Sequence, residues 1–229
     1  MKTAIQFFAL ILFSLAVKAQ NNPDWPNIKR YEEANSKVAA PAKGEKRVVY
    51  MGDSITDFWI NNDSTFFTHN NYYDRGISGQ TTGQMLVRFR EDVINLKPAV
   101  VVILAGINDI AENNGPSKLE DVAGNIKSMA ELARANNIKV VISSVLPANA
   151  FPWRPAINPV EKVSRLNSML KQYAAEKGIV YLDYFTKMVD DKAGLPAKYS
   201  KDGVHPNLEG YKVMEPLAQQ AIAKALKSK

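Results

Sequence analysis

A serine stands at the end of a strongly hydrophobic stretch near residue 50. The segment VVYMGDSITDFW, residues 48–59, begins with strand-forming residues, breaks at Gly52 and continues with Ser54 in a short polar cluster. A serine in this position can act as a nucleophile if a base lies within hydrogen-bond reach. It can equally serve as the N-cap of a helix that begins near Ile55. The local sequence leaves both roles open, so the choice depends on which other groups the fold brings nearby.

The segment DGVHPN supplies a candidate base, because Asp202 precedes His205 by three residues. Gly203 lets the backbone fold the carboxylate back onto the ring, and Pro206 keeps His205 out of helical geometry. A carboxylate bonded to Nδ1 fixes the imidazole tautomer and leaves Nε2 to accept a proton. The other histidine of the chain, His69, lies in the polar turn THNNY, where a solvated structural role is expected. The same Asp-x-x-His spacing also occurs at helix caps, so this pair gains weight only beside a serine.

Two further segments could supply donors to the oxyanion that develops when a carbonyl is attacked. Gly79, in RGISGQTT, offers a backbone N–H that no side chain covers, and Asn108, in AGIND, offers a side-chain amide. The backbone N–H of Ser54 is the third candidate donor. Ser78 is a rival nucleophile, but nothing beside it supplies a partner.

Five short apolar runs must position these groups. They are RVVYM (47–51), YYDRG (72–76), PAVVVILAG (98–106), IKVVISSVL (138–146) and GIVYLD (178–183). Helical periodicity fills the connections before the fourth and fifth runs, and a last helix is expected over residues 207–226, kinked or restarted at Pro216. The alternation predicts a three-layer α/β fold, in which helices cover both faces of a five-stranded parallel sheet through right-handed crossovers.

The predicted sheet gathers the candidate residues at one edge. In an open parallel sheet the ligand crevice lies beyond the carboxyl ends of the strands. Ser54, Gly79 and Asn108 follow the first, second and third runs, Trp153 follows the fourth, and His205 lies beyond the fifth. We therefore expect these residues to share one rim.

The N-terminus has the anatomy of a signal peptide. Residues 1–19 contain Lys2, an apolar run over residues 4–17, and the small residues Val17 and Ala19 before a cleavage point. The apolar run of 14 residues is short for the roughly 20 that cross a bilayer. The sequence therefore predicts an exported protein, periplasmic or extracellular, with no stable membrane insertion after cleavage.

The remaining chain divides into a leader and one domain. Residues 20–44 hold three prolines and Gly44, and they are expected to cross the surface before the fold begins. Residues 45–229 are long enough for one hydrophobic core, and the catalytic domain is placed there. The aromatic residues Trp59, Phe66 and Phe67 are expected in this core, with an acyl pocket as the alternative.

Composition excludes several classes of protein. The chain has no cysteine, so disulfides, thiolate chemistry and a thiol-linked lipid anchor are ruled out. Removal of residues 1–19 leaves 27 basic and 23 acidic residues, a net charge of +4. This is a mild excess, and lysines such as Lys224, Lys227 and Lys229 gather at the C-terminus, where cations suit the dipole of a final helix, so no nucleic-acid partner is expected.

Four short segments resemble, in order, the four blocks of the SGNH (GDSL) hydrolases. They are Gly52-Asp53-Ser54-Ile55, Gly79, Gly106-Ile107-Asn108-Asp109 and Asp202-Gly203-Val204-His205. The similarity runs from about residue 47 to the C-terminal helix, some four-fifths of the chain. Ile55 stands where these hydrolases usually carry leucine, an apolar exchange that leaves the chemistry unchanged.

The resemblance implies a flavodoxin-like three-layer fold and a serine esterase. It implies Ser54 as nucleophile, His205 as base and Asp202 as its orienter, with Gly79, Asn108 and the N–H of Ser54 as the oxyanion hole. The implied reaction is hydrolysis of a carboxylic ester through an acyl-serine, without a metal or an organic cofactor.

Two rival classes of function stay open. A flavodoxin-like ligand-binding module would leave Asp202, His205 and Asn108 without a role. A metal-dependent hydrolase could use Asp53, Asp57 and Asp109 as ligands. With two histidines and no cysteine, however, a zinc site would depend on carboxylates, which is uncommon for that metal.

The substrate is the least determined feature. The loop PANAFPWRPAINP, residues 147–159, has four prolines and is expected to form a stiff wall over the crevice. Trp153 in this loop is a candidate substrate contact, with a core-anchoring role as the alternative. Exported members of the family of this size resemble carbohydrate O-acetylesterases, lysophospholipases and short-chain lipid acetylhydrolases. Short acyl groups on a carbohydrate are the favoured hypothesis, with a lipid ester as the alternative, and the oligomeric state is not predicted.

Overall fold

A five-stranded, all-parallel sheet forms the centre of the molecule. The structure, a computed structural model, describes residues 24–228, so the predicted signal peptide (residues 1–19) lies outside the described part. The strands are β1 (Val48–Gly52), β2 (Tyr72–Gly76), β3 (Val100–Leu104), β4 (Lys139–Ser143) and β5 (Val180–Leu182), in the order β2-β1-β3-β4-β5. All five runs that the sequence predicts as strands are therefore strands of one parallel sheet.

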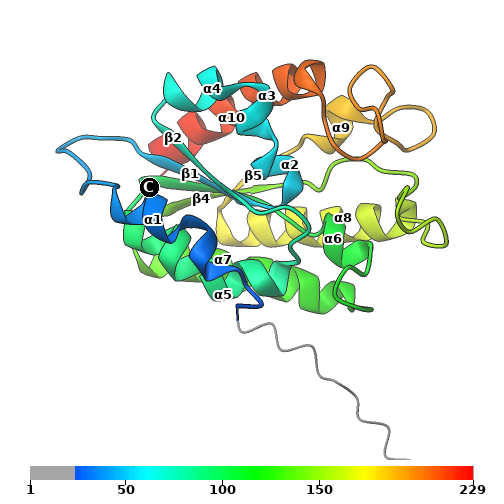
Figure 1. The fold of residues 1–229 in the computed structure, drawn as a ribbon, viewed down its shortest axis with the longest axis horizontal. Coiled ribbons are helices and arrows are strands. Elements are labelled where there is room, and N and C mark those ends of the chain that lie inside the picture. Colours follow the sequence, from blue (N-terminus) through cyan, green and yellow to red (C-terminus); the bar gives the residue numbers. More distant parts are fainter. Residues whose placement is uncertain (1–23, 229) are drawn as a thin grey trace, which may run out of the picture.

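Helices cover both faces of the sheet, which confirms the predicted three-layer α/β fold. In Figure 1, α5 (Thr82–Asp92), α7 (Leu119–Ala135) and α8 (Val160–Lys177) lie below the sheet, and α10 (Leu208–Lys227) lies above it with α3 (Trp59–Asn62) and α4 (Ser64–Thr68). The apolar positions of α7 that recur at helical spacing are all buried. The helix α10 runs through Pro216 as a single helix.

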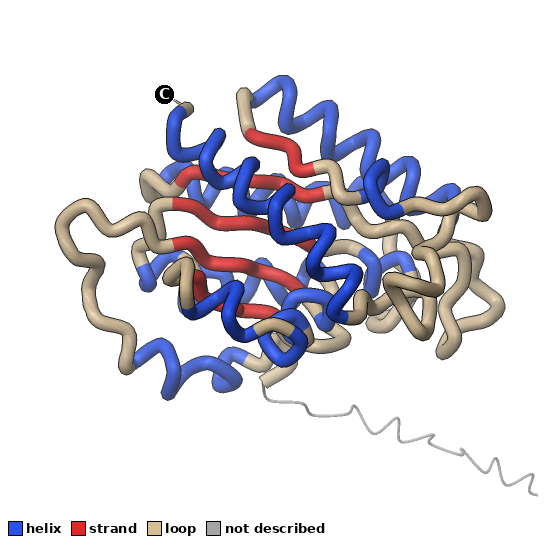
Figure 2. The backbone as a smooth tube through the Cα atoms, turned by 90° about the horizontal axis from the view of Figure 1, so that it is seen from above, coloured by secondary structure: helices blue, strands red, loops and turns tan. Residues whose placement is uncertain are grey.

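The remaining helices are short and lie mostly in the loops. They are η1 (Ile28–Tyr31), α1 (Glu32–Ser36), α2 (Ser54–Asp57), η2 (Ile94–Leu96), α6 (Ile107–Ile110) and α9 (Phe185–Met188). Figure 2 shows the strands side by side, with loops gathered beyond one end of the sheet. Among the described residues, no helix is long and apolar enough to cross a membrane.

The register of the central strands aligns their carboxyl ends. Gly52 at the end of β1 pairs with Gly76 of β2 on one side and with Leu104 of β3 on the other. Every residue of β1 and β3 is buried, as expected for strands covered on both faces. The loops that follow β1, β2 and β3 therefore begin at the same level of the sheet.

An aromatic cluster fills the core between β1 and α10. Trp59 stacks on Phe66 with ring centroids 5.0 Å apart, and on Tyr211 of α10 at 5.1 Å. Trp59, Phe66 and Phe67 are at most 5% exposed, which confirms their predicted place in the core. These rings support the chain immediately after α2 and so fix the position of that short helix.

Candidate active site

The helix α2 packs tightly against the ends of β1 and β2. A Cβ atom on Gly76 would lie 2.1 Å from the backbone nitrogen of Asp57, and one on Gly52 would lie 2.1 Å from Oγ1 of Thr56. Glycine is therefore required at both strand ends for α2 to lie across them. This close approach places Ser54, the first residue of α2, directly at the edge of the sheet.

Asp53, and not Ser54, caps this helix. The Asp53 carboxylate accepts a hydrogen bond of 2.9 Å from the N–H of Ile55. The Ser54 hydroxyl oxygen instead lies 2.8 Å from Nε2 of His205, 151 residues further along the chain. The alternative that the local sequence left open, Ser54 as an N-cap, is therefore wrong.

His205 lies between Ser54 and a carboxylate. Its Nδ1 is 2.6 Å from Oδ2 of Asp202. The other carboxylate oxygen, Oδ1, accepts from the backbone N–H of His205 at 2.8 Å and of Val204 at 2.9 Å. With the ring proton on Nδ1, His205 donates to Asp202 and presents a lone pair at Nε2 to the Ser54 hydroxyl.

Asp202 is held as an anion. Partial burial raises its pKa, but the hydrogen bonds from the His205 ring and from the N–H groups of His205 and Val204 outweigh this and lower the pKa to about 2. Ser200, which the sequence analysis missed, donates from Oγ to Oδ1 of Asp202 at 3.0 Å and accepts from the N–H of Gly203 at 2.9 Å. Gly203 has a φ of +79°, in the left-handed region that favours glycine, so the backbone adopts the conformation for which the sequence predicts a glycine here.

The candidate oxyanion donors follow the two neighbours of β1. Gly79 lies beyond β2 with a φ of +78°, and nothing lies within 4 Å of a Cβ built on it. Asn108 lies beyond β3 in α6 and is 3% exposed. Its amide donates to the carbonyl of Gln80 at 3.1 Å and accepts from the amide of Asn113 at 2.8 Å. These two bonds fix the plane of the Asn108 amide, and Asn113 is a second residue that sequence reasoning missed.

Two exposed aromatic rings flank His205. The ring of Trp153 has its centroid 6.0 Å from that of His205, and its Nε1 donates to Oδ1 of Asn113 at 3.2 Å. Phe58, which the sequence analysis did not single out, lies 5.3 Å from the same imidazole. Trp153 is 40% exposed and Phe58 is 36% exposed. Both rings are therefore placed where a bound molecule can touch them.

The three carboxylates considered as metal ligands, Asp53, Asp57 and Asp109, each accept hydrogen bonds from different protein groups. Asp57 accepts from the N–H of Ser78 at 3.1 Å, and Asp109 accepts from the N–H and the hydroxyl of Thr82 at 2.9 and 2.7 Å. Burial raises the pKa of Asp53 to about 7, partly offset by the N–H of Ile55. In the described range, residues 24–228, no group of three or more His, Cys, Asp or Glu side chains is arranged to hold a metal ion.

Sequence comparison agrees with this geometry. The model of the GDSL-like lipase/acylhydrolase family matches residues 50–213. Esterase TesA of Pseudomonas aeruginosa is 32% identical over 133 residues, which are 58% of this chain. The chain covers 59% of the length of that esterase.

Solved structures extend the similarity over most of the chain. An acylhydrolase candidate from Bacteroides fragilis has a TM-score of 0.87 at 53% identity, covering 89% of this chain and 99% of its own. A GDSL-like lipase from Bacteroides thetaiotaomicron has a TM-score of 0.86 at 52% identity, covering 87% and 98%. The acetylxylan esterase Axe2 of Geobacillus stearothermophilus shares the fold, with a TM-score of 0.63 at 18% identity over 81% of this chain and 96% of its own. The chain therefore belongs to the GDSL-like lipase/acylhydrolase family.

Proposed function

We propose that the protein is a serine esterase that hydrolyses carboxylic esters through an acyl-serine intermediate. Ser54 is the nucleophile, His205 the general base and Asp202 the group that orients the imidazole. The observation that carries this proposal is the line of contacts from Ser54 Oγ to His205 Nε2 at 2.8 Å and from His205 Nδ1 to Asp202 Oδ2 at 2.6 Å. A ligand-binding module would have no use for this line of three groups.

Acylation begins when His205 Nε2 takes the hydroxyl proton of Ser54. The Ser54 oxygen forms a bond to the ester carbonyl carbon, and the carbonyl electrons move to the oxygen. When this tetrahedral intermediate collapses, the bond to the alcohol oxygen breaks and His205 gives its proton to that oxygen. Water, activated by the same nitrogen, then attacks the acyl-serine, releases the acid and restores the Ser54 hydroxyl.

The oxyanion of both tetrahedral intermediates is stabilised by three donors. They are the backbone N–H groups of Ser54 and Gly79 and the side-chain amide of Asn108. A primary amide has two N–H bonds, and Asn108 uses one on the carbonyl of Gln80. The second N–H is then free to point at the substrate, because the contacts to Gln80 and Asn113 hold the amide plane fixed.

The substrate is a short acyl ester, such as an acetyl ester, of a carbohydrate. The exposed rings of Trp153 and Phe58 beside His205 support this, since aromatic faces pack well against the C–H faces of sugars. Axe2, an acetylxylan esterase, has the same fold. The same two apolar rings favour a second candidate, a lysophospholipid or short-chain lipid ester, in which they would contact the lipid.

The protein acts after export, in the periplasm or outside the cell. This part of the proposal depends on the signal-peptide pattern of residues 1–19, followed by a leader over residues 20–44 and the catalytic domain over residues 45–229. N-terminal sequencing of the protein recovered from outside the cytoplasm tests it. A first residue near position 20 is expected, and an intact residue 1 would contradict export by cleavage.

A panel of p-nitrophenyl esters from acetyl to palmitoyl, together with acetylated polysaccharides, tests the activity and its substrate. The wild type is expected to prefer acetyl, and Ser54→Ala is expected to lose activity by several orders of magnitude. Ser168→Ala is the matched control, because Ser168 is an exposed serine on α8, away from the site, and should leave the activity unchanged. Full activity in Ser54→Ala would overturn the proposed nucleophile, and a preference for palmitoyl esters would overturn the proposed acyl group.

A further inference from the structure

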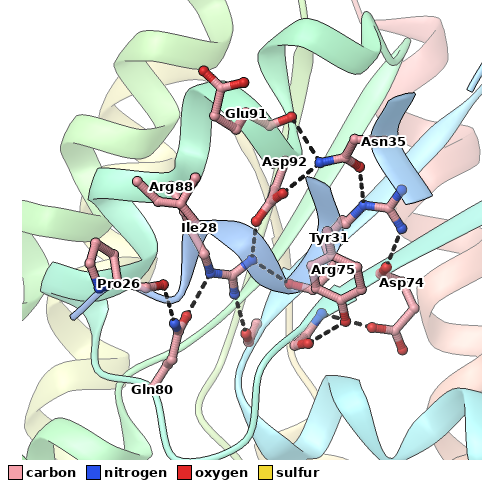
Figure 3. Close-up of polar contacts among 12 residues, drawn as sticks. Pro26, Ile28, Tyr31, Asn35, Asp74, Arg75, Gln80, Arg88, Glu91 and Asp92 are labelled. Carbon is pink, nitrogen blue, oxygen red and sulfur yellow. Dashed lines mark hydrogen bonds and ion pairs between the residues drawn. The ribbon is translucent and has the colours of Figure 1, made fainter. Parts of the chain in front are cut away.

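A buried polar network joins the N-terminal part of the structure to the loop that carries Gly79. We call residues 24–36 the N-terminal strap and residues 77–81 the oxyanion loop. Figure 3 shows strap residues Pro26, Tyr31 and Asn35 facing Gln80, Arg88 and Asp92 across this network. The strap lies outside the region that the family model matches, residues 50–213.

Gln80 is the centre of the network. Its side-chain amide donates to the carbonyl of Pro26 at 2.6 Å and accepts from Nε of Arg88 at 2.6 Å. Its backbone carbonyl accepts from the Asn108 side chain at 3.1 Å. Gln80 is 3% exposed and directly follows Gly79 in the chain. Gln80 is therefore connected to two candidate oxyanion donors. It is joined to Gly79 by a peptide bond and to the Asn108 side chain by a hydrogen bond.

Arg88 connects Gln80 to the ends of the strands. Its guanidinium donates to the carbonyl of Gly52 at 3.0 Å and to the carbonyl of Arg75 at 2.9 Å. It also pairs with Asp92 at 2.8 Å, and both side chains are fully buried. Gly52 lies two residues before Ser54, so the nucleophile and the oxyanion loop are tied to the same rigid cation.

The N-terminal strap closes the network from the other side. Asn35 donates to Oδ1 of Asp92 at 2.7 Å and accepts from Nε of Arg75 at 2.8 Å. The hydroxyl of Tyr31 donates to the carbonyl of Gly76, the last residue of β2, immediately before the oxyanion loop. The strap therefore contacts the residue that precedes the loop, through Tyr31, and Gln80 near the end of the loop, through Pro26.

We propose that Gln80 is a positioning residue for the oxyanion hole and that the N-terminal strap, by holding Gln80 and Gly76, is a working part of the active site. The inference rests on the proposed esterase function. Donors to an oxyanion act only when they lie at the place where charge develops in the transition state. A shift of about 1 Å in such a group costs on the order of 100-fold in rate. Loosening the loop should therefore lower kcat and leave KM nearly unchanged.

Gln80→Met removes the side-chain hydrogen bonds and keeps the length of the side chain. With p-nitrophenyl acetate, the variant is expected to have a kcat per active site about 10- to 100-fold below that of the wild type and a KM within about twofold of it. Active sites are counted from the initial burst of p-nitrophenol, so that misfolded protein does not count. The affinity for a trifluoromethyl ketone, which forms an oxyanion on Ser54, should fall by the same factor as kcat/KM. Gln172→Met on the exposed face of α8 is the matched control and should change neither quantity.

Tyr31→Phe is the second variant, because it removes one hydroxyl from the strap and leaves its packing in place. It should lower kcat per active site by about 3- to 10-fold with KM unchanged, and it decides the question if Gln80→Met does not fold. A normal kcat per active site in both folded variants would overturn the proposal, and so would a loss confined to the number of active sites. A wild type with no burst and no dependence on Ser54 would instead refute the proposed esterase function.

Discussion

Replacing Asp202 by asparagine should disable the enzyme through the tautomer of His205. In the structure, Oδ1 of Asp202 accepts three hydrogen bonds, from Ser200 Oγ and from the N–H groups of Val204 and His205. An asparagine keeps these three bonds only if its oxygen occupies the place of Oδ1. Its NH2 group must then stand where Oδ2 faces Nδ1 of His205.

An NH2 group at that place forces the imidazole proton onto Nε2. The NH2 is a donor, so Nδ1 of His205 must become the acceptor and Nε2 must carry the hydrogen. The ring then points a donor at Ser54 Oγ, 2.8 Å away, and cannot take its proton. A wrong tautomer in a triad of this kind costs about 10⁴-fold in kcat. The stability cost is small, because Asp202 is 40% exposed and the screened interaction is of about 1 kcal/mol or less.

The assay is kcat for p-nitrophenyl acetate at pH 8, with thermal unfolding measured on the same samples. Asp202→Asn is expected to fold with a nearly unchanged Tm and to lose about 10⁴-fold in kcat. Asp191→Asn, at an exposed position of the loop before α10, is the matched control and should keep full activity. An Asp202→Asn variant that keeps more than a tenth of the wild-type kcat would refute the orienting role of the carboxylate.

Three other perturbations have definite expected outcomes. Asn108→Ala should lower kcat by about 10²- to 10³-fold with little change in KM, as measured by steady-state kinetics, because it removes a proposed oxyanion donor. Trp153→Ala should raise KM for acetylated oligosaccharides more than for p-nitrophenyl acetate, and equal changes for both would place the ring outside the alcohol site. Asp74→Asn should raise the thermal stability at pH 8 more than at pH 5. Burial raises the pKa of Asp74 to about 7, although the hydrogen bond from the N–H of Gly76 lowers it. The carboxyl therefore binds its proton more tightly in the folded state. The stability that this protonation contributes is lost as the pH rises from about 4 through 7. Equal melting curves of wild type and variant at pH 8 would contradict this.

The sheet and the Ser54–His205–Asp202 line could be predicted because they depend on local patterns. The strands are short Val- and Ile-rich runs, and the parallel sheet places whatever follows each run at one edge. Ser54 follows the first run and His205 lies beyond the fifth, so the parallel sheet predicts both at this edge although they are 151 residues apart in the chain. The strands are shorter than some of the apolar runs, for example at β3, where the backbone leaves the sheet after Leu104 and turns at Gly106 with a φ of +119°.

The supporting residues could not be predicted, because their roles come from contacts between distant segments. Arg88 and Asp92 have the i, i+4 spacing of an ordinary surface ion pair on an amphipathic helix, yet both are fully buried. Asn113 and Ser200 lie in loops without a motif. Asn113 forms hydrogen bonds with Asn108 and Trp153, and Ser200 donates to Asp202. Phe58 follows Ser54, the proposed nucleophile, by four residues, and that spacing on a helical turn is the one signal in the sequence that its ring would lie near His205.

The burial of the Arg88 guanidinium is a consequence of the same sheet geometry that forms the crevice. A crevice at the carboxyl edge requires β1 and β2 to end inside the protein, where the buried backbone carbonyls near the strand ends must find donors within the protein; that of Gly52 also accepts from the N–H of Ile77 at 3.1 Å. Arg88 supplies N–H groups to the carbonyls of Gly52 and Arg75, and Asp92 balances its charge. Removing only one partner of such a buried pair leaves an uncompensated charge, which typically costs about 3–5 kcal/mol. The segments that carry Ser54 and Gly79 are thus both held by the buried Arg88–Asp92 pair, so a shift of one segment strains the contacts of the other. Donors to an oxyanion require this rigidity, because they must stay in place as the charge develops.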